Sequence, residues 1–373
     1  MNLVLAQDWI TDNGGGEACL RDLLNIYPKS PILTLIWNEK KVTQFNDTKI
    51  ITSYLNNYPK AKTHWRYYFP FMPRAVESLS VPGADVVISN CYSAIKGLIT
   101  KPETIHICYC HTPTRYLWLQ EIDQRLSGGN SIKSSIMSKL THNLRLWDFA
   151  AAQRPDIFIA NSKNTAKRIE KFYRRKTKFI YPPVDTDNFN ISPKNEIGNY
   201  YLFVSRLVPY KKADLVIRAF NLLGLPLKVA GDGPELGHIK KIAKNNVEIL
   251  GFVTKKERNR LFSKCKAFIF PAEEDFGIAP VEAMASGRPV IAFRKGGALE
   301  TVNEELSGVF FDKQDIQSLS QAVERFEKIK DRFEPKKIKN WANNFSREKY
   351  KENWQRLISK TLAEYRANAK INL

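Results

Sequence analysis

The stretch of the chain that decides the fold is residues 270–291, which read FPAEEDFGIAPVEAMASGRPVI. The pattern predicts a buried strand that ends at Pro271, then a loop that contains Gly277, and then a helix that begins near Ile278. A second strand is predicted to start after the turn at Gly287. Ligands of open parallel sheets bind beyond the carboxyl ends of the strands, so the loop is the predicted place for chemistry.

Two acidic side chains of this stretch are placed to bind hydroxyl groups. Glu274 lies on the predicted loop and Glu282 lies in the predicted helix, so that both can face one cleft. The backbone amides around Phe276, Gly277 and Ile278 lie at the helix N-terminus, where the helix dipole favours an anion such as phosphate. The stretch therefore predicts a phosphate site flanked by groups that bind two rings. Two solvent-facing glutamates beside a helix start are the alternative.

On both sides of this stretch, short apolar runs rich in Val and Ile alternate with amphipathic stretches, a pattern typical of parallel sheets covered on both faces. The first predicted series of strands comprises residues 3–6, 32–35, 85–89, 104–110, 156–160 and 178–181. The second series comprises residues 200–205, 227–230, 248–250, 267–270 and 289–293. The predicted fold class is α/β, with two Rossmann-like parallel-sheet domains that face a central cleft.

A predicted linker separates the two series. It begins at Pro182 and Pro183, and it continues as a polar run to Ile197. Prolines fix backbone angles and polar residues bury little surface, so this composition is typical of a domain boundary. We predict an N-terminal domain of residues 1–181, a C-terminal domain of residues 182–350, and a helix of residues 351–373 that packs back on the N-terminal domain.

Two cations follow the first strand of the second series, in residues 204–212, which read VSRLVPYKK. Arg206 and Lys211 could offset the charge of a diphosphate, and they would stabilise it most where negative charge builds on a leaving group. Lys212 is an alternative to Lys211 for this contact. Ordinary surface cations are the simpler interpretation.

Glycine turns follow other predicted strands. Gly231 and Gly233 open a predicted helix and let the backbone come close to a ligand. In the N-terminal domain, Gly15 and Gly16 precede a helix, which suits phosphate. Their spacing is not G-x-G-x-x-G, so a dinucleotide-dependent oxidoreductase is disfavoured. His111 leaves the carboxyl end of a predicted strand and is a candidate site residue, although a lone histidine is more often structural.

Residues 270–291 resemble the E-x7-E motif of glycosyltransferase family 4, with Glu274 and Glu282 in the two glutamate positions. Arg206 and Lys211 match the Arg-x4-Lys pair of the same family. The resemblance implies the GT-B fold, a nucleotide-diphosphate sugar as donor, and transfer with retention of configuration. It also implies that the first glutamate holds the donor sugar and that the second binds the ribose hydroxyls.

The resemblance implies roles for further residues of the chain. The implied catalytic residues are Arg206, Lys211, Glu274 and His111. The implied donor-binding residues are Gly15, Gly16, Gly231, Gly233, Phe252, Val253, Phe276, Gly277, Ile278 and Glu282. Lys212 stands where relatives often have glycine, which leaves open which lysine reaches the phosphates.

The chain looks like bacterial mannosyltransferases that build O-antigen or other surface polysaccharides. We expect GDP-mannose as donor, with UDP-sugars as the alternative, and a lipid-diphosphate-linked saccharide as acceptor. A rival from another class is an inactive sugar-nucleotide-binding scaffold at the membrane.

The charge balance predicts an anionic partner. Lys and Arg number 58 against 38 Asp and Glu, which gives a net charge of +20 and favours nucleic acid, anionic lipid or a diphosphate. No zinc-finger spacing or RNA-binding aromatic strand is present, so no nucleic-acid partner is expected. Residues 54–74 interleave aromatic and basic side chains, which suits contact with lipid headgroups; a buried aromatic cluster is the alternative.

The expected location is cytoplasmic and peripheral on the inner face of the cytoplasmic membrane, because the chain shows neither a spanning apolar stretch nor a signal peptide. Asp185 and Asp187 imitate a metal-binding Asp-x-Asp motif, but they lie in the predicted linker. We therefore expect no metal and no cofactor. The five cysteines indicate no disulfide framework, and Cys108 and Cys110 are expected on opposite faces of their strand.

Overall fold

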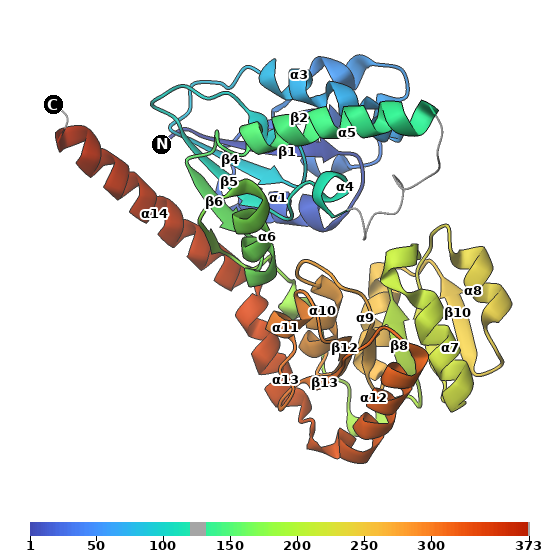
Figure 1. Ribbon diagram of the computed structural model, residues 1–373. Coiled ribbons are helices and arrows are strands. Elements are labelled where there is room, and N and C mark those ends of the chain that lie inside the picture. The colour runs from blue at the N-terminus through green and yellow to red at the C-terminus, as the bar shows by residue number, and fades with distance from the viewer. Residues whose placement is uncertain (120–131, 372–373) are drawn as a thin grey trace. The chain divides into compact units, whose positions relative to one another are not determined.

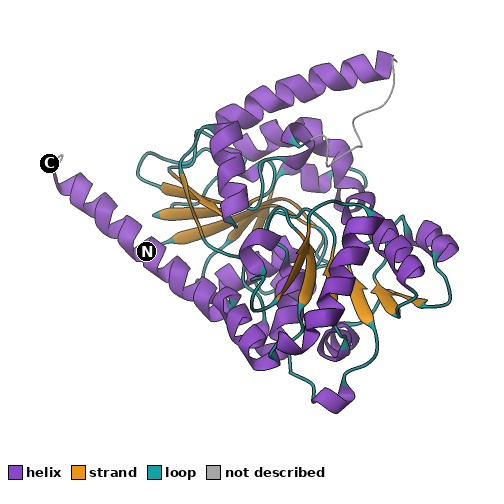
Figure 2. Ribbon diagram, turned by 60° about the horizontal axis from the view of Figure 1, so that its bottom comes forward, coloured by secondary structure: helices purple, strands orange, loops and turns teal. Residues whose placement is uncertain are grey.

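The computed structural model describes residues 1–119 and 132–371, which divide into two compact units (Figure 1). One unit comprises Met1–Tyr181 together with Asn353–Leu373, and the other comprises Pro182–Glu352. Each unit contains a parallel sheet, and Figure 2 shows helices outside the strands in each of them.

The sheet of the first unit has the strand order β3-β2-β1-β4-β5-β6-β7. Its strands are β1 (Leu3–Ile10), β2 (Ile32–Trp37), β3 (Ile50–Thr52), β4 (Val86–Cys91), β5 (Ile105–Cys110), β6 (Ile157–Ala160) and β7 (Thr177–Phe179). Its helices are α1 (Gly15–Ile26), α2 (Ala61–His64), α3 (Met72–Glu77), α4 (Arg115–Trp118), α5 (Ile132–Ala151) and α6 (Lys163–Tyr173).

The sheet of the second unit has the order β10-β9-β8-β11-β12-β13. Its strands are β8 (Tyr201–Val204), β9 (Leu227–Ala230), β10 (Val247–Gly251), β11 (Phe268–Phe270), β12 (Val290–Phe293) and β13 (Gly308–Phe311). Its helices are α7 (Ala213–Leu223), α8 (Leu236–Ile242), α9 (Lys255–Lys264), α10 (Ile278–Ala285), α11 (Ala298–Thr301), α12 (Ile316–Ile329) and α13 (Pro335–Ala342).

Both sheets therefore repeat one topology, in which the first strand lies beside the fourth: β1 beside β4, and β8 beside β11. This is the doubly wound Rossmann order, and its ligand crevice lies where the order reverses. The predicted α/β class with two Rossmann-like domains is confirmed. The edge strands β3 and β13 were not predicted, although strands of similar length, such as β8 and β11, were.

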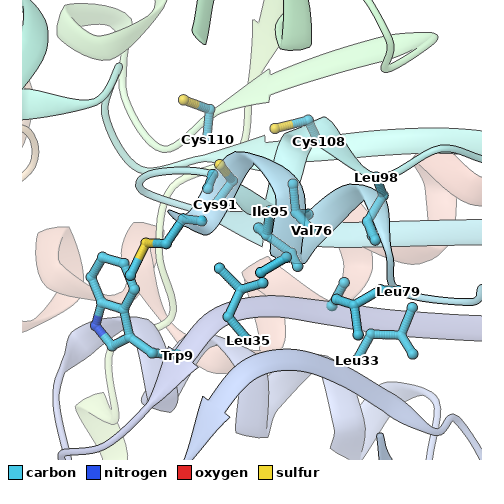
Figure 3. Packing of buried hydrophobic residues seen from close by; sticks show 14 of the residues in the cluster. Trp9, Leu33, Leu35, Val76, Leu79, Cys91, Ile95, Leu98, Cys108 and Cys110 are labelled. Carbon is cyan, nitrogen blue, oxygen red and sulfur yellow. The ribbon is translucent and has the colours of Figure 1, made fainter. Parts of the chain in front are cut away.

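The central strands β1, β4 and β5 bury both faces, so they read as largely continuous apolar runs rather than as alternating ones. All eight residues of β1 are buried. Figure 3 shows Cys91, Cys108 and Cys110 in one cluster with apolar side chains from the neighbouring elements. The expectation that Cys108 and Cys110 occupy opposite faces was wrong, because side chains two residues apart in a strand point the same way. All five cysteines are buried and free.

The C-terminal helix α14 (Arg347–Ile371) belongs to both units along its length. Within the first unit, the fully buried Trp354 packs edge-on against Tyr109 of β5, with 5.5 Å between the ring centroids. Further along, the Tyr365 hydroxyl donates to the Pro102 carbonyl at 3.4 Å. Among the helices of the described residues, none combines the length and the apolar character that crossing a bilayer demands.

Candidate functional site

An ion pair joins the two loops that leave the reversal point of the second sheet. Arg206 and Lys211 follow β8, and Glu274 follows the neighbouring strand β11. The Lys211 ammonium forms an ion pair with the Glu274 carboxylate, and both side chains are largely buried. Arg206 lies on the same loop, is exposed, and has no ion-pair partner within the described residues. A cation and a carboxylate thus lie together where this fold binds ligands.

Only one of the two adjacent lysines takes part in this pair. Lys212 adopts a left-handed conformation with φ of 59° and is the N-cap residue of α7. Glycine reaches that conformation without the steric cost that other residues bear. The Lys212 side chain lines a shallow hollow with Arg218 and Gln314. The structure therefore favours Lys211 over Lys212 as the cation that faces Glu274.

The second acidic residue of the motif is held by a helix that sequence reasoning did not consider. Glu282 lies in α10 with its side chain 14% exposed, and its Oε1 is 2.9 Å from Nη2 of Arg258 on α9. Burial raises the pKa of Glu282 to about 7, and the nearby Arg258 and Lys255 oppose this rise. Arg258 is thus the direct partner that favours the ionised carboxylate. The sequence offers no signal that would single out this arginine.

The residue before α10 is Gly277, and its backbone conformation favours glycine. Gly277 has φ of 88°, and a Cβ there would approach the Phe270 ring to 3.0 Å. The first amides of a helix have no intrahelical acceptor, so those at Gly277 and Ile278 are suited to an anion. The loop before them is stabilised by a hydrogen bond from a later segment of the chain, in which the Gly297 amide donates to the Glu274 carbonyl at 2.8 Å. Phe276 is buried and supports the loop by packing.

The predicted glycine turn after β9 lies against the loop that carries Arg206. The Leu207 amide donates to the Asp232 carbonyl at 2.8 Å, and the Gly231 amide donates to the Gly251 carbonyl at 2.7 Å. A Cβ on Gly233 would lie 2.3 Å from the Leu207 carbonyl oxygen. The two glycines therefore allow the loops after β8 and β9 to approach each other.

Phe252 and Val253 follow β10, the edge strand next to β9. The Phe252 side chain is exposed and Val253 is half-buried. They are linked to the rest of the site through the Gly231–Gly251 hydrogen bond. Their predicted contact with a base stays a prediction.

In the first unit, one asparagine joins two predicted site residues. The Asn90 amide nitrogen donates to Gln7 Oε1 at 2.6 Å and to the Gly16 carbonyl at 2.9 Å. Its oxygen lies 2.6 Å from Nε2 of His111. Because that amide oxygen can only accept, Nε2 must carry the proton in this network. His111 and Gly16 are thus brought together at the reversal point between β1 and β4.

Asn90 was missed by sequence reasoning, although a signal existed. It is a polar residue at the carboxyl end of an apolar strand, β4, and that end lies at the ligand edge of the sheet. Gly15 and Gly16 were predicted to precede a helix, and they form the first two residues of α1 itself. A Cβ on Gly16 would lie 2.9 Å from the Tyr92 ring, so glycine permits this close packing. Glu17 follows in the first turn, and burial raises its pKa to about 7.

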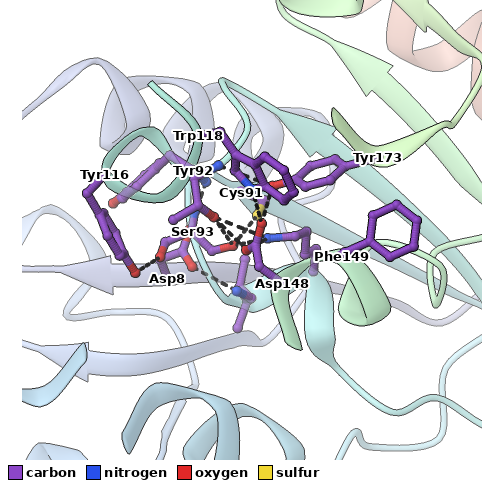
Figure 4. A network of polar contacts seen from close by, with 12 residues as sticks. Asp8, Cys91, Tyr92, Ser93, Tyr116, Trp118, Asp148, Phe149 and Tyr173 are labelled. Carbon is purple, nitrogen blue, oxygen red and sulfur yellow. Dashed lines mark hydrogen bonds and ion pairs between the residues drawn. The ribbon is translucent and has the colours of Figure 1, made fainter. Parts of the chain in front are cut away.

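A buried polar network that includes Asp8, Ser93 and Asp148 supports the loops at this edge of the first sheet (Figure 4). The Asp8 carboxylate accepts hydrogen bonds from the amides of Tyr92, Ser93 and Ile95. The Asp148 carboxylate accepts from Lys96, Thr114, Trp118 and Tyr173. Buried polar groups are stable only when they are hydrogen-bonded; Asp148 also forms an ion pair with Lys96, whereas the groups that donate to Asp8 are backbone amides. The network ties the segment after β4 to the segment after β5, which begins with His111.

The first aspartate of the Asp185-x-Asp187 sequence, which resembles a metal-binding motif, forms ion pairs with basic side chains. Asp185 forms ion pairs with Lys255 at 3.3 Å and with Arg347 at 3.2 Å. Over residues 1–119 and 132–371, no group of three or more His, Cys, Asp and Glu side chains could hold a metal ion. Metal independence stays a prediction.

Comparisons with known proteins give consistent matches. The family described as Glycosyltransferase Family 4 matches residues 15–188, and the family described as Glycosyl transferases group 1 matches residues 184–347. The O-antigen chain mannosyltransferase C of Escherichia coli is 23% identical over 58% of this chain and 60% of its own length.

A GDP-mannose-dependent alpha-(1-6)-phosphatidylinositol monomannoside mannosyltransferase of Mycobacterium tuberculosis is 30% identical over 39% of this chain and 45% of its own length. The chain thus spans about half the length of these two relatives. Among solved structures, Anabaena HepE in complex with UDP-glucose has a TM-score of 0.70 at 20% identity, and the match covers 96% of this chain and 100% of that chain. This likeness shows the shared fold.

Proposed function

The chain belongs to the family 4 glycosyltransferases of the GT-B fold, and from this premise we propose that it transfers a hexose from a nucleotide-diphosphate donor to a saccharide acceptor. The proposed donor is GDP-mannose, and the proposed acceptor is a lipid-diphosphate-linked saccharide in surface polysaccharide synthesis. The names of the two mannosyltransferase relatives support this choice of hexose. A UDP-sugar is the alternative donor.

The observation that carries the proposal is the Lys211–Glu274 ion pair at the reversal point of the second sheet. The cation is suited to the diphosphate, and the carboxylate is suited to the hydroxyls of the hexose. Glu282, one helix turn or more further on, is suited to the ribose hydroxyls. Such a set of groups would bind both ends of a nucleotide-diphosphate sugar.

In the proposed reaction, the acceptor hydroxyl oxygen bonds to the anomeric carbon while the bond from that carbon to the diphosphate oxygen breaks. The hydroxyl proton passes to a phosphate oxygen, and configuration is retained, as the family resemblance implies. Arg206 and Lys211 would stabilise the charge of the departing diphosphate, so neither a metal nor a cofactor is invoked. His111 and the turn at Gly15 and Gly16 are proposed to contact the donor.

The proposed location is the cytoplasmic face of a membrane, where a lipid-linked acceptor would be found. The net charge of +20 supports attraction to anionic headgroups. No nucleic-acid partner is proposed.

Ligand binding and turnover together test the proposed function. We expect GDP-mannose to raise the Tm of the purified protein more than UDP-glucose or ADP-glucose, because a ligand at a hundred times its Kd stabilises the folded state by about 2.7 kcal/mol. Transfer to a lipid-linked saccharide is measured as the release of the nucleoside diphosphate. Binding with no turnover on any acceptor would instead support an inactive scaffold. Salt-sensitive binding of duplex DNA that the nucleotide sugars do not displace would contradict the assignment.

The pairing of Glu282 with Arg258 predicts how donor affinity depends on pH. The pKa of Glu282 is about 7, and an ionised carboxylate accepts hydrogen bonds from the two ribose hydroxyls more strongly than the protonated acid does. Donor affinity should therefore fall as the pH drops through about 7. Arg258→Met removes the cation that favours ionisation, so the pKa rises and the loss of affinity begins at higher pH.

The measurement is the Kd of the donor, determined by calorimetry between pH 5.5 and 9. This range extends above and below the pKa of Glu282, which is about 7. Arg260→Met is the matched control, because Arg260 is an exposed arginine of the same helix, α9. It should leave the pH profile in place. Identical profiles for the wild type and Arg258→Met would show that Arg258 does not tune Glu282.

A further inference from the structure

Residues 54–74, which we term the aromatic insertion, present two faces with opposite properties. The segment folds as short helical turns between β3 and β4. Leu55, Ala61 and Met72 are buried in the core of the first unit. Tyr67, Phe71 and Tyr58 lie on the surface with exposures of 77%, 54% and 46%. Large exposed hydrophobic side chains that gather in one short segment mark an interaction surface.

The exposed face of the aromatic insertion is also basic. Lys60, Arg66 and Arg74 are exposed, and residues 54–76 contain neither Asp nor Glu. Lys62 is held by Glu39 at 2.7 Å, outside the segment. The surface therefore presents aromatic rings next to positive charge. This combination suits the interface of a bilayer, where rings lie at headgroup depth and cations meet phosphates.

The aromatic insertion is tied to the ligand edge of the first sheet through stacked rings. Trp65 stacks on Trp9 near the end of β1, with 3.8 Å between the centroids. Phe69 stacks on Tyr116, which lies in α4 shortly after His111, with 4.4 Å between the centroids. The exposed face is thus built on the elements that position His111 and the Gly15–Gly16 turn.

We propose that the exposed face of the aromatic insertion is a docking surface for an anionic phospholipid bilayer. Charge complementarity selects this partner, because the segment is basic and the chain carries a net charge of +20. Docking would bring the carboxyl edge of the first sheet close to the headgroup layer. Delivery of a lipid-linked acceptor to this edge rests on the proposed function. Docking to the bilayer does not depend on the proposed function.

Vesicle binding by the full-length protein tests the docking surface in the absence of donor and turnover. The wild type should cosediment with phosphatidylcholine vesicles that contain phosphatidylglycerol, and it should bind pure phosphatidylcholine far more weakly. The double variant Tyr67→Ser with Phe71→Ser, and the double variant Arg66→Gln with Arg74→Gln, should each lower the partition coefficient about tenfold or more. Added salt should weaken binding of the wild type more than that of the charge variant.

The matched control is Leu222→Ser with Leu299→Ser, which removes two exposed leucines from the second unit and should leave vesicle binding unchanged. All the substituted side chains are exposed, and unchanged Tm values would verify folding. Equal vesicle binding by the aromatic variant and the wild type would overturn the proposal, as would a preference for duplex DNA over anionic vesicles. Transfer to a water-soluble acceptor should survive in the aromatic variant, so failure of docking is distinguishable from failure of the proposed function.

Discussion

Replacing Lys211 by Ala is expected to lower kcat for hexose transfer by about 10²- to 10³-fold, or roughly 3–4 kcal/mol in the transition state. The physical reason is the placement of the ammonium group beside Glu274 at the reversal point of the second sheet. Negative charge grows on the diphosphate as its bond to the sugar breaks. A fixed cation in a partly buried site stabilises that charge more than it stabilises the bound donor.

The matched control for Lys211→Ala is Lys212→Ala. Both variants lose one positive charge, but the Lys212 side chain lines the hollow with Arg218 instead of pairing with Glu274. Ala in the left-handed conformation bears a strain similar to that of Lys, so the backbone is not altered. We expect transfer rates within about threefold of the wild type for Lys212→Ala, and a loss for Arg206→Ala similar to that for Lys211→Ala.

Rates are measured as release of the nucleoside diphosphate in the presence of acceptor, at saturating donor. If Lys211→Ala turned over at the wild-type rate while Lys212→Ala lost activity, the assignment of the diphosphate contact would pass to Lys212. Unchanged turnover in both variants and in Arg206→Ala would remove the proposed charge stabilisation altogether.

Gly233→Ala is expected to destabilise the second unit by roughly 2–4 kcal/mol and to impair transfer. Gly233 has φ of 156°, and a Cβ there would lie 2.3 Å from the Leu207 carbonyl oxygen and 2.8 Å from its carbonyl carbon. Both are backbone atoms, which cannot rotate away as a side chain can. The loop after β8 must therefore move, and that loop carries Arg206.

Gly237→Ala is the matched control for Gly233→Ala, because a Cβ on Gly237 meets nothing within 4 Å. Gly237 lies in α8, where Ala is favoured over Gly by about 0.5–1 kcal/mol. Urea unfolding and thermal melts measure both variants. We expect a lower Tm for Gly233→Ala and an unchanged or slightly higher Tm for Gly237→Ala. A Gly233→Ala protein as stable and active as the wild type would show that the two loops need not approach each other.

Much of the fold was predictable because its elements leave strong local patterns. Parallel strands that are buried on both faces read as apolar runs, and the loop and helix of residues 270–291 were placed correctly around Gly277 and Ile278. The edge strands β3 and β13 were missed, although β13 is as long as β8 and is fully buried. Cys108 and Cys110 were expected on opposite faces of their strand because the alternation of side chains was applied wrongly. Residues two apart in a strand lie on the same face.

The candidate site was predictable only in part. Glu274 and Glu282 were found from one motif, and Arg206 and Lys211 from another; the residues of each motif lie close together in the sequence. Arg258 was not found, because it meets Glu282 through a contact between two helices that no local pattern specifies. Asn90 was overlooked although its place at the carboxyl end of β4 was a signal. The pKa of Glu282 likewise depends on its burial, which no local pattern specifies.

Local periodicity and short motifs can be recognised along the chain without the structure. They were enough to predict the repeated strand–helix alternation, the family, and the residue types at the ends of β8 and β11. Only the tertiary structure decided which groups meet. Lys211, and not Lys212, forms the ion pair with Glu274. Arg258 forms the ion pair with Glu282. Asn90 accepts a hydrogen bond from His111 and so places the proton on Nε2. The physical reason is that hydrogen bonds and ion pairs act over a few ångströms in space, and the strand order of each sheet decides which distant residues come within that range.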